Sequence, residues 1–159
     1  LELIDCSEKE AEEDYLDGLE VEANYFAGVF GIDFMEGDVL DEAVDLYRQV
    51  YARSRFTVDP AAKIDDATYG VKVTVEPIDV FHLVADELTS DTPASSLVQA
   101  FDAAWARMII GLTLEKLPES GYLEAESKVV QVVRDEEDLW SIPQSDYDDL
   151  DGRIIDYNF

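Results

Sequence analysis

The chain is poor in the residues that build most metal and redox sites. Its 159 residues include one cysteine, Cys6, and one histidine, His82. A single cysteine forms no internal disulfide and supplies no cysteine-based zinc site, and one histidine excludes any site made of several imidazoles. A glycine-rich phosphate loop and a Gly-x-Ser-x-Gly nucleophile turn are also missing from the sequence. We therefore expect no resident metal, no cofactor and no nucleophilic, phosphoryl-transfer or redox chemistry.

Positive charge is scarce as well. Eleven lysines and arginines stand against 38 aspartates and glutamates, which gives a formal net charge of −27. Nucleic acids and anionic lipid headgroups are bound largely through basic side chains, so we expect neither as a partner. Three explanations of the acidity stay open: solubility of an exported protein, adaptation to a salty cytoplasm, and binding of a cation or a basic partner.

Long apolar runs are absent too. No stretch reaches the roughly 18 apolar residues that span a bilayer, so membrane insertion is not expected. The chain begins at Leu1 with no basic and apolar leader, so we expect a processed or trimmed form from which any signal peptide is already gone. Cys6 invites interpretation as a lipid-attachment site, but it follows the charged Asp5 rather than a small residue. A free thiol near a lightly packed start is the favoured alternative.

The chain does hold enough apolar residues, 47%, to build a core. Its length fits one domain and no repeat or linker divides it, so we expect a single domain, residues 1–159. Hydrophobic spacing predicts two helices, a strand hairpin, two more helices, a second hairpin, a short acidic helix and a tail. The predicted ranges are 5–30, 38–54, 55–59, 68–76, 79–89, 93–117, 127–134, 139–142, 144–150 and 153–159.

Several local signals support these elements. Ser7 followed by Glu10 predicts a capping box at the first helix, Asp38 an N-cap, and Thr92 with Pro93 another helix start. Residues 68–76 alternate between apolar and polar, which indicates a strand with one buried face. Strand hairpins without β-α-β alternation favour an α+β class. We expect a curved four-stranded antiparallel sheet wrapped by helices, in the form of a cone-shaped roll.

Three segments carry a family resemblance. Residues 69–79 (YGVKVTVEPID), the strand at 139–142 with the acidic helix after it, and the leading helix with Tyr25 and Phe26 resemble small exported lipoproteins of Gram-positive gut anaerobes. The domain of those proteins is similar to the nuclear transport factor and SnoaL-like (cystatin-like) superfamily. The resemblance implies a location outside the cell or on its surface, with a signal peptide and a lipidated cysteine upstream of Leu1.

Candidate sites are few. Aromatic side chains that could line a ligand pocket under a concave sheet are Tyr25, Tyr47, Tyr51, Trp105 and Trp140, with Tyr15 and Phe26 beside them. Core packing is the favoured alternative for this set. His82 could act as a general base or pair with Asp86 one turn later.

Two acidic clusters complete the candidates. Residues 146–152 fail the EF-hand pattern, because placing Gly152 at its glycine position puts Tyr147 first and Asn158 last, where Asp and Glu belong. Residues 135–138 are expected at a solvated hairpin tip. No catalytic or metal-binding residue is assigned.

We therefore expect a non-enzymatic exported or cell-envelope module that binds an unknown protein or small ligand. The alternative is a small SnoaL-like enzyme that uses a pocket carboxylate or His82 as general base. A cytosolic domain of a salt-adapted organism is a third hypothesis.

Overall fold

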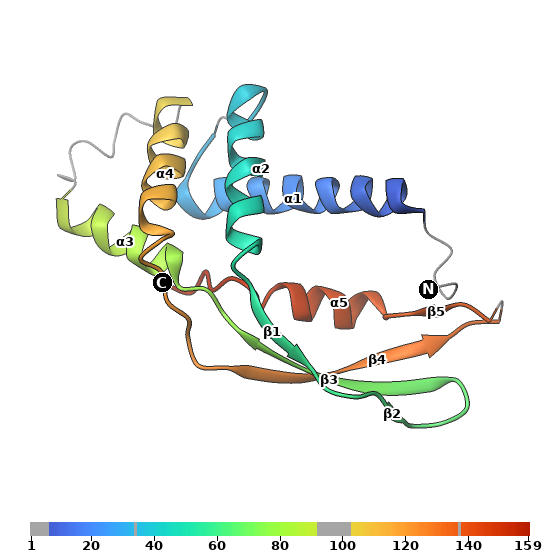
Figure 1. The fold of residues 1–159 in the computed structure, drawn as a ribbon. Coiled ribbons are helices and arrows are strands. Elements are labelled where there is room, and N and C mark those ends of the chain that lie inside the picture. Colours follow the sequence, from blue (N-terminus) through green and yellow to red (C-terminus); the bar gives the residue numbers. More distant parts are fainter. Residues whose placement is uncertain (1–6, 34, 92–102, 137) are drawn as a thin grey trace.

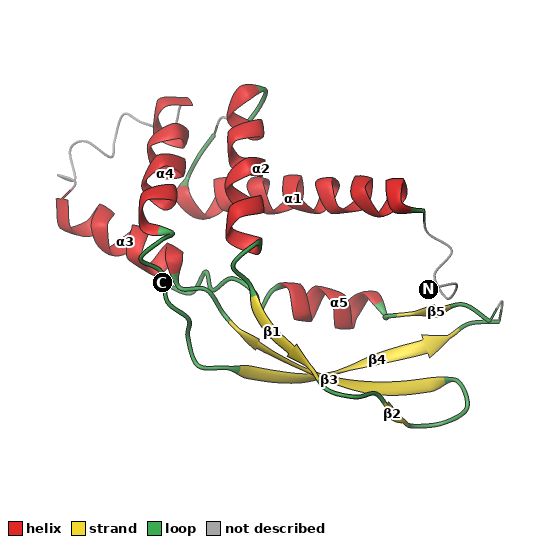
Figure 2. Cartoon of the chain, in the orientation of Figure 1, coloured by secondary structure: helices red, strands yellow, loops and turns green. Residues whose placement is uncertain are grey.

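The computed structural model describes residues 7–33, 35–91, 103–136 and 138–159. Within these ranges the chain forms five helices and five strands (Figures 1 and 2). The helices are α1 (Glu8–Phe30), α2 (Asp38–Tyr51), α3 (Val80–Asp91), α4 (Ala103–Lys116) and α5 (Gln144–Asp151). The strands are β1 (Arg55–Val58), β2 (Ala62–Lys63), β3 (Thr68–Glu76), β4 (Glu126–Arg134) and β5 (Trp140–Ser141).

The five strands occupy four positions in one antiparallel sheet. β3 pairs with β4 from Thr68 opposite Val133 to Val75 opposite Glu126. The other edge of β3 carries β1 along its C-terminal half and β2 along its N-terminal half, and β5 adds a short outer strand to β4. The sheet is curved, α1 and α5 extend over one of its faces, and α2, α3 and α4 gather near the end where β1 begins (Figure 1). The predicted fold class, an α+β roll with a curved four-stranded antiparallel sheet, is confirmed.

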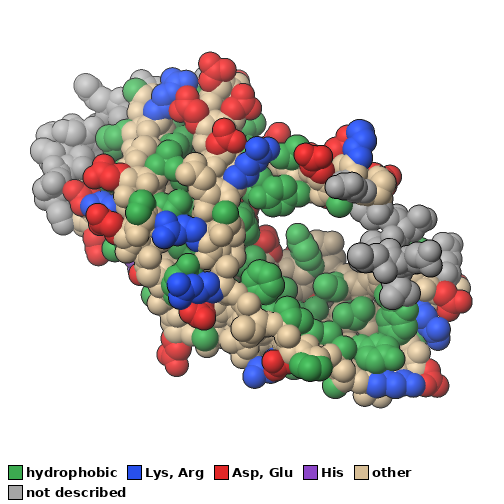
Figure 3. Space-filling view, viewed as in Figure 1, with side chains coloured by type: hydrophobic (Ala, Val, Ile, Leu, Met, Phe, Trp, Pro, Cys, Tyr) green, Lys and Arg blue, Asp and Glu red, His purple; other side chains and the backbone are tan. Residues whose placement is uncertain are grey.

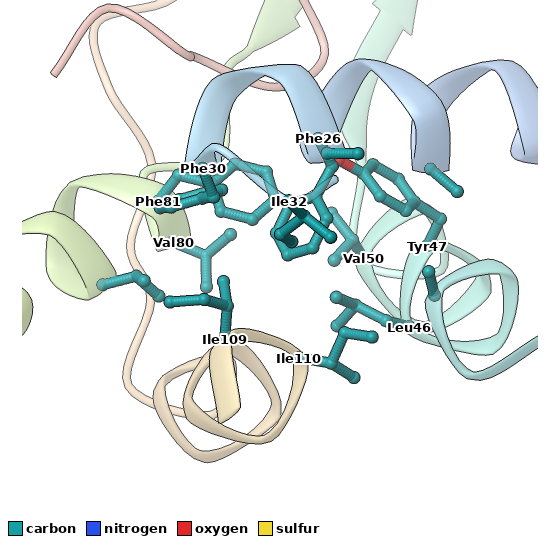
Figure 4. Packing of buried hydrophobic residues seen from close by; sticks show 14 of the residues in the cluster. Phe26, Phe30, Ile32, Leu46, Tyr47, Val50, Val80, Phe81, Ile109 and Ile110 are labelled. Carbon is teal, nitrogen blue, oxygen red and sulfur yellow. The ribbon is translucent and has the colours of Figure 1, made fainter. Parts of the chain in front are cut away.

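The main hydrophobic core lies among the helices rather than on the sheet. Phe26 of α1, Tyr47 of α2 and Phe81 of α3 are all fully buried, and Ile109 of α4 closes the cluster (Figure 4). The rings of Phe26 and Phe81 lie 5.6 Å apart, centroid to centroid. The buried cluster on the sheet is much smaller and consists of Val73, Val75 and Val130. Much of the sheet's helix-facing surface is therefore left thinly covered.

The C-terminal segment, expected as a tail, is part of the core. Ile78 donates a backbone hydrogen bond to Ile154 at 3.0 Å, and Ile155 is buried in a short parallel bridge with Ile78. Tyr157 stacks on Phe81 at 5.0 Å, and Phe159 stacks on Phe30 at 5.5 Å. The prediction of a tail was wrong because residues 155, 157 and 159 alternate like a strand over a window too short to stand out in the sequence.

The local predictions agree with the structure in most places. The capping box of Ser7 and Glu10 is confirmed, as is the strand Thr68–Glu76. Asp38 is not the cap of α2, because Gly37 takes that position with a φ of 54° that glycine adopts without strain. The expected connection over 60–67 contains β2. The predictions on Cys6, on Thr92 with Pro93, and on the start of the fourth helix lie outside the described residues.

Candidate functional site

An apolar hollow lies on the helix-facing side of the sheet, and we call it the sheet trough. Its volume is about 310 Å³. Strands β1, β3 and β4 form its floor, and α5 with the segments on either side of it forms one wall. Its lining is entirely apolar and consists of Phe56, Val58, Val71, Val73, Val75, Val130, Val132, Ile142, Leu150 and Ile154. Figure 3 shows these hydrophobic surfaces as a green band below α1, where the molecule is hollowed.

The period-two pattern of the strands creates the trough. Val71, Val73 and Val75 share one face of β3, and the partners of Val75 and Val73 on β1 are Phe56 and Val58. Val73 and Val75 are buried, whereas Phe56 is 61% exposed and Val58 is 59% exposed. The trough is therefore open along β1. Contiguous exposed apolar surface on a folded domain is typical of a binding site.

Ion pairs hold α5 against the edge of β4. Lys128 Nζ of β4 lies 2.6 Å from Asp149 and 3.4 Å from Asp146, and Arg153 contacts both Asp149 and Glu126. These hydrogen bonds from Arg153 and Lys128 lower the pKa of Asp149. The backbone N–H of Gln131 also donates to Asp146 at 2.8 Å. α5 has no buried residue, so charge and edge contacts, more than apolar burial, hold it in place.

A second hollow, of about 450 Å³, lies between α1 and α5. We call it the tyrosine cleft. Its polar lining combines three tyrosines with four carboxylates and one amide: Tyr15, Tyr51, Tyr147, Asp14, Glu22, Asp148, Asp151 and Gln144. No lysine, arginine or histidine is among its lining residues. Ile154 borders this cleft and the sheet trough, so α5 separates two adjoining hollows of different chemistry.

Two carboxylates of the cleft, Glu22 and Asp151, are hydrogen-bonded to partly buried tyrosines. Tyr157 Oη donates to Glu22 Oε2 at 2.9 Å and lies 2.6 Å from the Tyr47 hydroxyl, and Tyr51 Oη donates to Asp151 Oδ1 at 3.2 Å. Burial raises the pKa of Glu22, and the charge of Asp151 adds to this rise while the Tyr157 bond opposes it. Burial also raises the pKa of Asp151. Both groups carry charge that the described structure leaves poorly compensated.

The predicted aromatic set is dispersed. Tyr47 is buried in the helical core, and Tyr51 lies in the tyrosine cleft. Tyr25 is 55% exposed on α1, with its ring against Tyr157. Trp105 Nε1 of α4 donates to the Phe30 carbonyl at 2.9 Å.

Trp140 lies at the far end of the sheet. Its ring contacts Tyr69 at 5.3 Å and the Arg134 guanidinium at 5.6 Å. Trp140 is paired with Arg134 of β4, and Arg134 shares a sheet face with Val132 because the two are two residues apart. Trp140 and Val132 therefore lie on the same face of the sheet. The five aromatics predicted as pocket residues therefore do not meet in one pocket, and whether any of them binds a ligand stays a prediction.

His82 is joined to the C-terminal segment. Its Nε2 lies 2.8 Å from Asp156 Oδ2, and its ring packs edge-on against Phe159. Burial raises the pKa of Asp156, but hydrogen bonds from His82 and Asn158 outweigh it and lower that pKa overall. His82 lines neither the trough nor the cleft. This arrangement ties α3 to the chain's last residues.

The two acidic clusters lie in a turn and on a helix. Asp135 begins the turn between β4 and β5, where its carboxylate accepts the Leu139 N–H at 2.9 Å, while Glu137 is outside the described residues. Residues 146–151 lie on α5. In the part of the chain that the structure describes, no three histidine, cysteine or acidic side chains are grouped as they would be around a metal ion. The described helices also include none with the length and apolar character of a membrane span.

Sequence reasoning missed the carboxylates Glu22 and Asp151 and their partner Tyr157. They come from α1, from α5 and from the C-terminal segment, so no local spacing connects them. The alternation of Val71, Val73 and Val75 did predict an apolar sheet face. It could not show that this face stays partly uncovered, because that depends on where α1 and α5 lie.

Comparisons with known proteins identify a similar fold but no family. No protein-family model matches the chain, and no curated protein matches it. Among solved structures, the chain is similar to ycdA of Bacillus subtilis subsp. subtilis str. 168, a proposed lipoprotein. The two share 15% sequence identity with a TM-score of 0.60, over 91% of this chain and 47% of ycdA. The chain thus spans about half the length of that protein. At this identity the likeness establishes a shared fold, and membership of the SnoaL-like superfamily stays a prediction.

Proposed function

We propose that the chain is a non-enzymatic binding module of the bacterial cell surface or exterior, and that it holds an apolar group in the sheet trough. The observation that carries the proposal is the trough itself, an open hollow whose lining residues are all apolar. Ligand sites in proteins are concave and mostly apolar, which matches this surface. The trough lining offers no titratable side chain that could act on a substrate, which favours binding over catalysis.

The location rests on two supports. The acidic surface suits an exported protein, and ycdA, which shares the fold, is a proposed lipoprotein. A lipid anchor on a cysteine before Leu1 belongs to this proposal. Metabolic labelling tests the anchor: cells that express the full gene product are grown with a radiolabelled fatty acid. Labelled product in the membrane fraction supports the anchor. Unlabelled product in that fraction and in the medium contradicts it.

The trough can be tested with an uncharged fluorescent probe such as Nile red, because an anionic dye would be repelled by the net charge of −27. Val58→Ser places a hydroxyl on the trough floor. Val129→Ser is the matched control, since Val129 is 58% exposed against 59% for Val58, yet pairs with Lys72 on the opposite sheet face. We expect the first variant to weaken binding severalfold and the second to leave it unchanged. Equal effects of the two, or no binding by the parent, would remove the proposal.

A second candidate function is supported by one observation. Glu22 and Asp151 have raised pKa values in a cleft, as carboxylates that act as general bases often do. Mass spectrometry of candidate ligands after incubation separates the two functions. Conversion by the parent that is lost in Glu22→Gln or Asp151→Asn supports an enzyme, and binding without conversion supports the module.

A further inference from the structure

The two hollows on either side of α5 differ in chemistry but adjoin one another. The sheet trough is apolar, and the tyrosine cleft between α1 and α5 holds four carboxylates and three tyrosine rings. Ile154 borders both of them, and Leu150 faces the trough while Asp151, the next residue, faces the cleft. In Figure 3 the hollow between α1 and the sheet opens toward the viewer with its apolar floor visible. Since the two hollows share Ile154, an apolar surface and a polar surface lie next to each other at this point of the fold.

The cleft is suited to a positively charged group. Glu22 and Asp151 are partly withdrawn from water, and the hydrogen bonds they accept come from neutral tyrosine hydroxyls at 2.9 and 3.2 Å. Withdrawn carboxylates without a basic partner are costly, and a bound cation would supply the missing charge. Arg153, two residues after α5, and Lys128 of β4 are both engaged with Asp149, which does not line the cleft.

The tyrosines select among cations. Tyr15, Tyr51 and Tyr147 line the cleft together with the carboxylates, and aromatic rings attract weakly hydrated organic cations such as quaternary ammonium groups. Calcium and magnesium instead require six or more closely placed oxygen ligands. An organic ammonium group therefore fits this lining better than a metal ion does.

Building on the proposed binding function, we propose that the ligand is a cationic amphiphile whose aliphatic chain lies in the sheet trough and whose ammonium head lies in the tyrosine cleft. Fatty acids and other anionic amphiphiles are disfavoured, because their heads would meet four carboxylates on a chain of net charge −27. α5 is the shared wall: its Leu150 lines the trough, and its Tyr147 and Asp151 line the cleft.

Isothermal titration with three dodecyl amphiphiles below their micelle-forming concentrations tests the proposal. The heads are trimethylammonium, uncharged maltoside and sulfate on the same chain. We expect one trimethylammonium molecule per chain, bound about tenfold more tightly than the maltoside, with the sulfate weakest. The maltoside reports on the trough alone, so it tests the proposed function separately from the head-group assignment.

Variants assign the two ends of the ligand. Glu22→Gln with Asp151→Asn should weaken trimethylammonium binding about tenfold and leave maltoside binding unchanged. Glu20→Gln, which removes an exposed charge from the same helix, should change neither by more than about twofold. Val58→Ser should weaken both amphiphiles severalfold.

Each of the other outcomes contradicts a specific part of the proposal. Equal binding of trimethylammonium and maltoside, both sensitive to Val58→Ser, leaves the proposed function standing and removes the cationic head. If Glu20→Gln and the cleft variant weaken trimethylammonium binding equally, the binding reflects general attraction to the acidic surface. That result also rejects the assignment of the cationic head to the cleft. Trimethylammonium binding that depends on the cleft but not on Val58, with no maltoside binding, removes the trough as a site. No binding by any amphiphile removes both proposals.

Discussion

Replacing Tyr157 by phenylalanine tests whether the hydroxyl network that joins α1, α2 and the C-terminal segment stabilises the fold. The substitution keeps the ring, which stacks on Phe81 at 5.0 Å, and removes one hydroxyl. That hydroxyl lies 2.6 Å from the Tyr47 hydroxyl and donates to Glu22 at 2.9 Å. Removing this hydroxyl therefore takes a hydrogen-bond partner from both the Tyr47 hydroxyl and the Glu22 carboxylate.

The structure gives the size of the effect. Tyr47 is fully buried, so water does not replace its lost partner, and an unsatisfied buried hydroxyl costs about 1–3 kcal/mol. The bond to Glu22 is charge-assisted, but Glu22 is partly exposed and water can substitute there, which leaves about 1 kcal/mol. We expect Tyr157→Phe to lower the free energy of unfolding by about 2–4 kcal/mol.

A double-mutant cycle with Tyr47→Phe provides the decisive comparison. That variant removes the hydroxyl that would be orphaned and leaves Tyr157 bonded to Glu22, so it should cost about 1 kcal/mol or less. The double variant should be at least about 1 kcal/mol more stable than the sum of the single effects predicts. Urea unfolding followed by tryptophan fluorescence measures all four proteins.

The control for this cycle is Tyr25→Phe, because Tyr25 is 55% exposed and its loss of a hydroxyl should change stability by less than about 0.5 kcal/mol. If Tyr157→Phe costs no more than the control, the network contributes nothing to stability. If the single costs simply add in the double variant, the Tyr47 hydroxyl is not orphaned in the way the geometry requires. Either result refutes the reasoning.

Three further predictions concern Glu22, Phe81 and the first turn of α1. The pKa of Glu22 is higher in the folded chain than in the unfolded chain. As pH rises from below the unfolded-state pKa to above the folded-state pKa, ionisation of Glu22 therefore lowers the free energy of unfolding. Glu22→Gln should therefore be more stable than the parent at neutral pH and lose this advantage below about pH 4, as thermal unfolding across pH will show. Phe81→Ala should cost about 3–5 kcal/mol in urea unfolding, because the buried ring contacts Phe26, Phe30 and Tyr157, and a cost below about 1 kcal/mol would contradict this packing. Ser7→Ala should speed amide exchange in the first turn of α1 about fivefold by removing a cap worth about 1 kcal/mol, and unchanged exchange would show that the capping box contributes little.

The sequence allowed the elements to be predicted wherever the signal is local. Residues 68–76 alternate strictly, and Ser7 and Glu10 stand three residues apart, so both features could be read from neighbours in the chain. The fold class followed from the order of helices and hairpins. Gly37 replaced Asp38 as the cap because a residue with positive φ was needed at the turn, a requirement that depends on the direction of the preceding chain.

The candidate site could be predicted only in part. The apolar face of β3 was visible as alternation, but the openness of the trough depends on distant packing. Tyr47, Tyr157 and Glu22 meet from positions 47, 157 and 22, and hydrogen bonds across such separations leave no local pattern. Helical spacing suggested Asp86 for His82, whereas the bond that the structure shows runs to Asp156.

The strand-like pairing of Ile78 with residues 154–156 affects how the chain can fold. The buried cluster of α1, α2 and α3 is completed by Ile155 and Tyr157, which a ribosome adds more than 120 residues after Phe30. Contacts that span so much sequence must wait for loop closure and slow the final step. Helices α1, α2 and α3 therefore keep part of their apolar surface exposed until residues 155–157 are available to cover it. Apolar surface of this kind favours aggregation until it is covered.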